Sequence, residues 1–98
     1  MWKPFENGNT IGQIGSENGI ILEDEVIKDS CRITLEKDGA IALFSITCGV
    51  YGLMVHTTFS NNETDAKTKY EGMKKDLEAF IQSDENESKW CRKFTSKW

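Results

Sequence analysis

The side chains suited to acid–base or nucleophilic catalysis are few and far apart in this chain. His56 is the only histidine, which makes it the first candidate for a general acid or base. Cys31, Cys48 and Cys91 are the candidate nucleophiles, and each would need to lie within hydrogen-bond reach of that imidazole. The strand registers derived below put Cys31 and Cys48 on the face opposite His56, whereas Cys91 is not excluded. No residue is evident to orient the imidazole, so we expect a protein that is not an enzyme.

Metal and cofactor motifs are equally sparse. The acidic run Glu23-Asp24-Glu25 is the one candidate cation site, but alternate side chains of a strand point to opposite faces, so three converging carboxylates are not available. The sequence has no zinc-ligand spacing, no EF-hand loop and no Walker A motif, and the glycines of residues 12–19 do not match a dinucleotide-binding pattern. We expect no metal and no cofactor.

Composition and charge exclude further classes of protein. With 98 residues, 38% hydrophobic and 29% charged, the chain is expected to form a single globular domain, residues 1–98. A net charge of −4 is the opposite of the positive field that nucleic-acid binding needs. Three distant cysteines favour free thiols in a reducing compartment, and no signal peptide or integral membrane segment is evident. We expect a soluble cytoplasmic protein.

The pattern of turns and apolar residues divides the domain into a sheet, a helix and a tail. Residues 1–10 are rich in turn formers and are expected to be an irregular lead-in. Turn dipeptides at Asn18-Gly19 and Asp38-Gly39 divide residues 11–59 into an antiparallel meander of four or five strands. The predicted fold class is therefore α+β. The predicted strands are Ile11–Glu17, Ile20–Ile27, Cys31–Lys37, Ala40–Cys48 and Tyr51–Phe59.

Two predicted turns set the register of the central strands. A two-residue turn at Asp38-Gly39 pairs Ile33 with Phe44, and a two-residue turn at Gly49-Val50 pairs Phe44 with Val55. Because cross-strand partners point to the same face, the two registers build one core face. Its predicted members are Cys31, Ile33, Leu35, Ala42, Phe44, Ile46, Cys48, Tyr51, Leu53, Val55 and Phe59.

The first hairpin leaves two registers open. A two-residue turn near Asp29 sends Leu22 and Val26 to the core, whereas a three-residue loop sends Ile27 there instead.

Residues 62–82 have the spacing of an amphipathic helix. Asn61 or Asn62 is a suitable N-cap, and one apolar stripe recurs at steps of three and four residues. Gly72 lies inside this helix at a cost of about 0.5–1 kcal/mol relative to alanine, so either another backbone approaches there or the helix tolerates the loss. We expect the stripe to cover the core face of the sheet. Its members are Ala66, Tyr70, Met73, Leu77, Phe80 and Ile81.

The other face of the sheet is expected to stay open, because one helix cannot cover both faces. In the predicted register Leu43 lies opposite His56, and Ile41 and Met54 lie close by. Such a patch is either ordinary scattered surface hydrophobicity or a surface covered by the tail, by a second copy of the chain or by a partner.

The tail, residues 83–98, combines an acidic connector with a basic aromatic segment. Trp90, Phe94 and Trp98 are spaced four residues apart, which places them on one side of a helix, but the even spacing fits a strand equally well. Such a segment either folds back on its own domain or forms a membrane-surface or partner-binding helix.

The leading functional hypothesis is a small non-catalytic protein-interaction or binding module. Its candidate binding residues are the second-face patch of Ile41, Leu43, Met54 and His56 together with the tail aromatics Trp90, Phe94 and Trp98. Its partner would be another protein or a second copy of the chain in a homodimer. The alternative is a small-ligand binder or enzyme that uses His56 in a cleft between the sheet and the tail.

Overall fold

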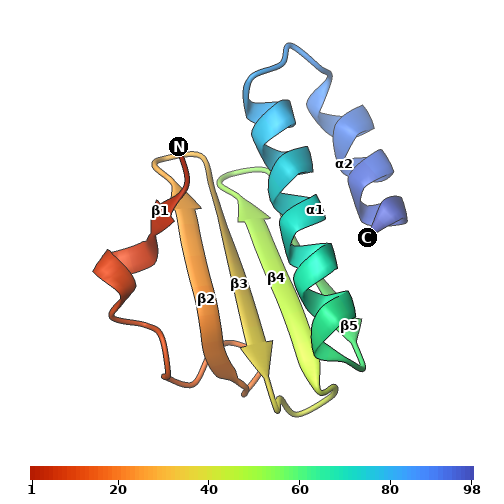
Figure 1. Ribbon diagram of the computed structural model, residues 1–98. Helices are drawn as coiled ribbons and strands as arrows, with labels where there is room; N and C mark the ends of the chain where they lie inside the picture. Colours follow the sequence, from red (N-terminus) through yellow and green to blue (C-terminus); the bar gives the residue numbers. More distant parts are fainter.

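The computed structural model describes residues 1–98 as a five-stranded antiparallel sheet with two helices packed on one of its faces (Figure 1). The strands lie in the order of the chain. This is the predicted α+β meander with a long helix across one face. The elements are β1 (Lys3–Pro4), the short 3-10 helix η1 (Phe5–Gly8), β2 (Ile20–Ile27), β3 (Cys31–Lys37), β4 (Phe44–Val50), β5 (Met54–Ser60), α1 (Glu63–Ile81) and α2 (Glu87–Lys97).

The first strand of the sheet is not the predicted one. Residues 11–17 make a single bridge, Ile14 to Ile20, and the edge strand is Lys3–Pro4, inside the predicted lead-in. Gly12 has a φ of +86°, outside the β region, so this stretch turns instead of extending.

The predicted register between β3 and β4 is wrong, yet the faces it assigned are right. Ile33 pairs with Cys48 and not with Phe44, because residues 38–43 form the connection in place of a two-residue turn. The slip is four residues. An even slip leaves every side chain on its predicted face, so Ile33, Leu35, Ile46 and Cys48 are all buried beneath the helices.

The register between β4 and β5 is wrong in a way that exchanges the two faces. Phe44 pairs with Ser60 and not with Val55, because the chain turns at residues 51–53, where Gly52 has a φ of +77°. The slip is five residues, and an odd slip moves each β5 side chain to the other face. Met54 and His56 therefore share the helix face with Cys48. Val55 and Phe59 point to the opposite face, called the second face below.

The first hairpin takes the three-residue alternative. Ile27 pairs with Cys31 across residues 28–30, and Ile27 is buried. Asp29 adopts a φ of +60° in this turn, a conformation that aspartate tolerates better than most residues.

Helix α1 begins and packs as its sequence predicts. The Asn62 side chain accepts a hydrogen bond from the main-chain N–H of Asp65 at 2.8 Å, which caps the helix. The predicted stripe faces the sheet and is completely buried at Ala66, Tyr70, Met73 and Leu77.

The tail is a helix, and it covers the helix face of the sheet, not the second face. The Trp90 ring stacks on Phe80 of α1 at a centroid distance of 4.1 Å and on Phe94 at 4.8 Å. Phe94 in turn meets the His56 ring of β5 edge-on at 6.0 Å. This row of rings ties α2 to both α1 and the sheet. Neither helix is long and apolar enough to cross a membrane.

Gly72 marks the place where the last residue of the chain packs on α1. A Cβ atom at Gly72 would lie 2.6 Å from Cη2 of Trp98, so a side chain approaches there and not a second backbone. The indole Nε1 of Trp98 donates to Asp76 at 2.9 Å, and the Nζ of Lys97 donates to the same carboxylate oxygen. Glycine at this position makes room for the indole.

Gly72→Ala should therefore have an effect that depends on Trp98. In a Trp98→Ala background we expect it to stabilise the fold by about 0.5–1 kcal/mol, the helix-propensity gain. With Trp98 present, displacement of the indole should cancel most of that gain. Urea unfolding of the four proteins of this double-mutant cycle measures the coupling. An equal gain in both backgrounds would show that Trp98 does not pack on Gly72.

Candidate functional site

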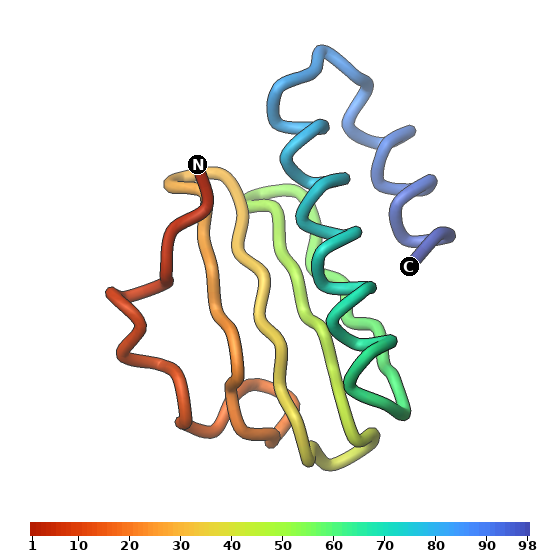
Figure 2. The backbone as a smooth tube through the Cα atoms, viewed as in Figure 1, coloured from red at the N-terminus to blue at the C-terminus, as the bar shows by residue number.

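The second face is partly covered by the N-terminal part of the chain. After η1, residues 9–19 run along the outside of β2 and loop back at the ends of β2 and β3 (Figure 2). We call residues 9–19 the covering segment. Its hydrogen bonds reach two carboxylates on the second face, Asp24 of β2 and Glu36 of β3, both of which are buried.

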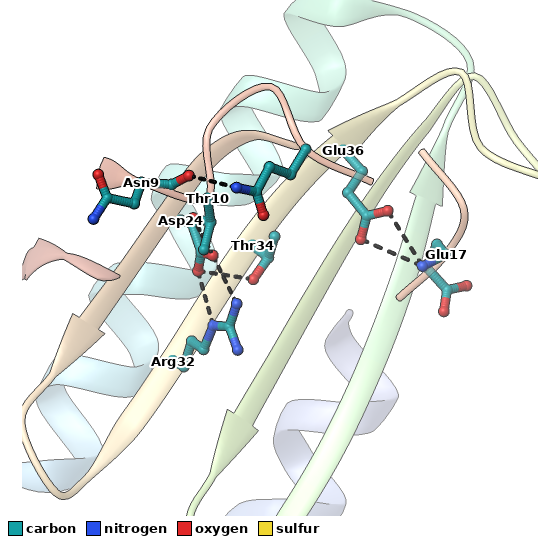
Figure 3. Close-up of polar contacts among 8 residues, drawn as sticks. Asn9, Thr10, Glu17, Asp24, Arg32, Thr34 and Glu36 are labelled. Carbon is teal, nitrogen blue, oxygen red and sulfur yellow. Dashed lines mark hydrogen bonds and ion pairs between the residues drawn. The ribbon is translucent and has the colours of Figure 1, made fainter. Parts of the chain in front are cut away.

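Asp24 is the centre of the first polar cluster (Figure 3). Its carboxylate accepts from Nε and Nη2 of Arg32 at 2.9 and 2.7 Å. It also accepts from the hydroxyls of Thr10 and Thr34, at 2.8 and 3.1 Å. Both oxygens are thus used twice, which suits a buried carboxylate because an unpaired charge in the protein interior is costly.

Arg32 is held in a fixed orientation by this cluster. Its guanidinium carbon lies 3.7 Å from the centroid of the Phe5 ring, a cation–π contact with η1. The hydrogen bonds to Asp24 raise the pKa of Arg32 above its ordinary value, so the group stays charged. Its Nη1 bonds no atom of the chain, and 36% of the side chain is exposed. Arg32 therefore presents a free donor from an ordered position.

Glu36 anchors the other end of the covering segment. Its Oε1 accepts from the main-chain N–H groups of Glu17 at 3.2 Å and Gly19 at 3.0 Å. A Cβ atom at Gly15 would lie only 2.4 Å from the carboxyl carbon of Glu36. A side chain at position 15 would push the carboxylate aside, so glycine lets the backbone pass directly over it.

Between the covering segment and β5 the second face forms an open groove of about 730 Å³. Arg32, Thr34 and Thr47 belong to its lining from β3 and β4. Its rim carries three apolar side chains, Ile14, Tyr51 and Val55, which are 67%, 52% and 78% exposed. We refer to this site as the groove.

The structure does not bring the predicted patch residues together. Ile41 and Leu43 lie exposed in the connection between β3 and β4, and neither lines the groove. Met54 and His56 belong to the helix face, although Met54 also contributes to the groove lining. Leu43 is not opposite His56, because Cys48 occupies that position. The odd slip of β5 accounts for the error.

The tail aromatics do not line the groove. Trp90 and Phe94 are buried in the main core, and Trp98 is half-buried against Gly72. Their contacts are with their own domain, as the folded-back alternative for the tail expects.

His56 has a neighbour that the predicted register ruled out. It is the cross-strand partner of Cys48 on the helix face, yet no hydrogen bond joins the two side chains. Burial raises the pKa of Cys48 to about 12, so its thiol is protonated at neutral pH and is a poor nucleophile. The Nε2 of His56 is buried beside Phe94 without a hydrogen-bond partner, and His56 does not line the groove.

The acidic run separates as strand geometry requires. Asp24 serves the second face, whereas Glu25 on the helix face accepts from the Tyr70 hydroxyl at 2.7 Å and pairs with Lys74 at 2.8 Å. Tyr51, predicted as a member of the core face, is instead 52% exposed at the groove rim, and no role was predicted for Arg32. The sequence feature that could have indicated the polar cluster is Asp24, because a charged residue in the middle of a strand needs hydrogen-bond donors if it is buried.

Searches with this chain found no matching protein-family model, no matching curated protein and no matching solved structure. The geometry of the groove is therefore the basis of the functional argument.

Asp24→Ala should lower the free energy of unfolding by about 3 kcal/mol, because four hydrogen bonds lose their acceptor and Arg32 loses its partner. Thr34→Val removes one of those bonds and should cost about 1 kcal/mol. Asp84→Ala, at an exposed position between the helices, should change stability by less than about 0.5 kcal/mol. Urea unfolding at pH 7 measures all three. A loss for Asp24→Ala no larger than that for Asp84→Ala would contradict the cluster.

Proposed function

We propose that this protein is a non-catalytic protein-interaction module that binds a segment of a partner protein in the groove. The observation that carries the proposal is the rim of the groove, where the apolar side chains of Ile14, Tyr51 and Val55 are exposed to solvent around a concave site. Exposed apolar side chains grouped around a depression are typical of binding surfaces. The helix face supports the same choice, because its apolar side chains are already enclosed by α1 and α2.

The chemistry of the groove favours a partner segment with two features. The rim suits an apolar anchor side chain, since desolvating Tyr51 and its neighbours would supply most of the binding energy. The free Nη1 of Arg32 suits a hydrogen-bond acceptor, either a main-chain carbonyl or a carboxylate. Arg32 is already ordered by Asp24 and Phe5, so little side-chain entropy is lost when it binds.

The alternative that uses His56 receives less support. It requires a cleft between the sheet and the tail, and Phe94 of the tail packs against the His56 ring there. A small apolar ligand in the groove is the competing occupant, because a volume of 730 Å³ also falls in the usual range for small-molecule sites.

Selection of binders from a random peptide library displayed on phage tests the proposal. We expect enriched peptides that share an apolar anchor and shift the NMR signals of groove residues. Ile14→Ser and Tyr51→Ser should each weaken binding about tenfold or more. Ile41→Ser is the matched control, because Ile41 is more exposed than either residue but lies outside the groove, and it should leave the affinity unchanged. Peptides that bind all three variants equally, or that shift only the helix face, would overturn the proposal.

A further inference from the structure

The two edges of the sheet differ in how they are protected. The β1 edge is two residues long and consists of a lysine and a proline, features that discourage pairing with another strand. The β5 edge runs from Met54 to Ser60 and contains no proline, lysine, arginine, aspartate or glutamate. Its valine, threonines and phenylalanine are good strand formers. One edge is therefore blocked and the other is suited to pairing.

The hydrogen bonds of the neighbouring strand β4 show which main-chain groups of β5 point away from the sheet. The N–H of Tyr51, the residue after β4, donates to the carbonyl of Ser30, the residue before β3. Because the bonding direction alternates along an antiparallel strand, the main-chain groups of the odd-numbered residues of β4 point toward β3. The even-numbered residues of β4 therefore bond β5, through its own even-numbered residues. Val55, Thr57 and Phe59 are left with their N–H and C=O groups directed away from the sheet.

One contact supports this assignment and limits the free region. The Nζ of Lys69 on α1 donates to the Phe59 carbonyl at 3.1 Å, as an outward-facing carbonyl allows. Because the even-numbered residues of β5 make the ladder bonds to β4, the main-chain groups of Val55 and Thr57 are left unbonded, and neither residue takes part in a main-chain bond outside the ladders. Val55 and Thr57, two successive outward-facing residues, thus offer two donors and two acceptors. The Val55 side chain is largely exposed.

We propose that two copies of this chain pair antiparallel through their β5 edges and form one continuous sheet. A two-fold axis at His56 places Val55 of each copy opposite Thr57 of the other. This register makes four N–H···O bonds from the free groups and leaves the Lys69 contact in place. A partner strand must itself have an unpaired edge, and a second copy brings the same one, so a single two-fold contact satisfies both.

The charge and side-chain pattern of β5 suits this occupant. The strand carries no acidic or strongly basic residue, so two copies bring no like charges together along the shared edge. The Val55 side chain stands perpendicular to the sheet on the second face, next to Thr57 of the other copy. The two grooves would then lie on the same face of the joined sheet, each with Val55 at the part of its rim nearest the shared edge.

Light scattering on a sizing column, over a range of protein concentrations, tests the proposal. The wild-type chain should have twice the 11.1 kDa mass of one copy. Val55→Pro removes an N–H that bonds nothing within the chain, so the monomer should fold normally, with an unchanged circular dichroism spectrum, and have the mass of a single copy. Val55→Thr keeps the N–H and should remain a dimer.

A second variant decides the matter if the proline change disturbs folding. Val55→Lys keeps the backbone intact and adds a like charge to each side of the shared edge, so it should also give the single-copy mass. A wild-type chain that is monomeric at every concentration would overturn the proposal. A dimer that persists in folded Val55→Pro or Val55→Lys would overturn it as well, since its interface would lie elsewhere.

Discussion

The burial of two carboxylates on the second face is the constraint on which the rest of the structure depends. Asp24 and Glu36 lie on a sheet face that has no helix to cover it, and each is nonetheless almost completely buried. A buried carboxylate without donors would cost several kcal/mol, so the chain must bring donors to it. Arg32 and two threonine hydroxyls supply them for Asp24, and the main-chain N–H groups of the covering segment supply them for Glu36.

This constraint explains why the molecule has one closed face and one half-open face. On the helix face, α1 and the ring row of α2 enclose an apolar core that needs nothing further. On the second face, residues 9–19 are fixed by the two carboxylates and reach only part of the way across the sheet. The groove is the part of the second face that stays uncovered, bounded by the covering segment and by residues 51–55. The groove thus follows from the way the polar groups of the second face are satisfied.

The sequence was sufficient for those parts of the fold that local spacing determines. The stripe of α1 and its Asn62 cap were predicted because both are local patterns along one helix. The core members of β3 and β4 were also predicted, although their turn was misplaced, because a slip of four residues preserves the faces. For β5 a slip of five residues exchanged them, and His56 was assigned to the wrong side. The choice between helix and strand for the tail needed packing information, since its aromatic spacing fits both.

The groove was beyond prediction because it depends on contacts between distant residues. Nothing local to Gly15 or Glu17 indicates that they lie over Glu36, some twenty positions later in the chain. From the sequence, Arg32 is an ordinary strand residue of the open face. Its fixed orientation comes from Asp24, which also accepts a hydrogen bond from the distant Thr10. The predicted patch of Ile41, Leu43, Met54 and His56 failed for the same reason, since it rested on a register that only the real turns decide.

The most direct test of this account is the amide hydrogen exchange of Glu17 and Gly19, measured by NMR. If the buried Glu36 carboxylate holds the covering segment, these two amides should exchange as slowly as many amides within the sheet, although they lie outside its strands. The amide of Asn61, in the exposed connection before α1, should exchange rapidly and serves as the internal reference. Exchange of Glu17 and Gly19 as fast as that of Asn61 would contradict the account, because the covering segment would then be free of the sheet and the groove would have no wall.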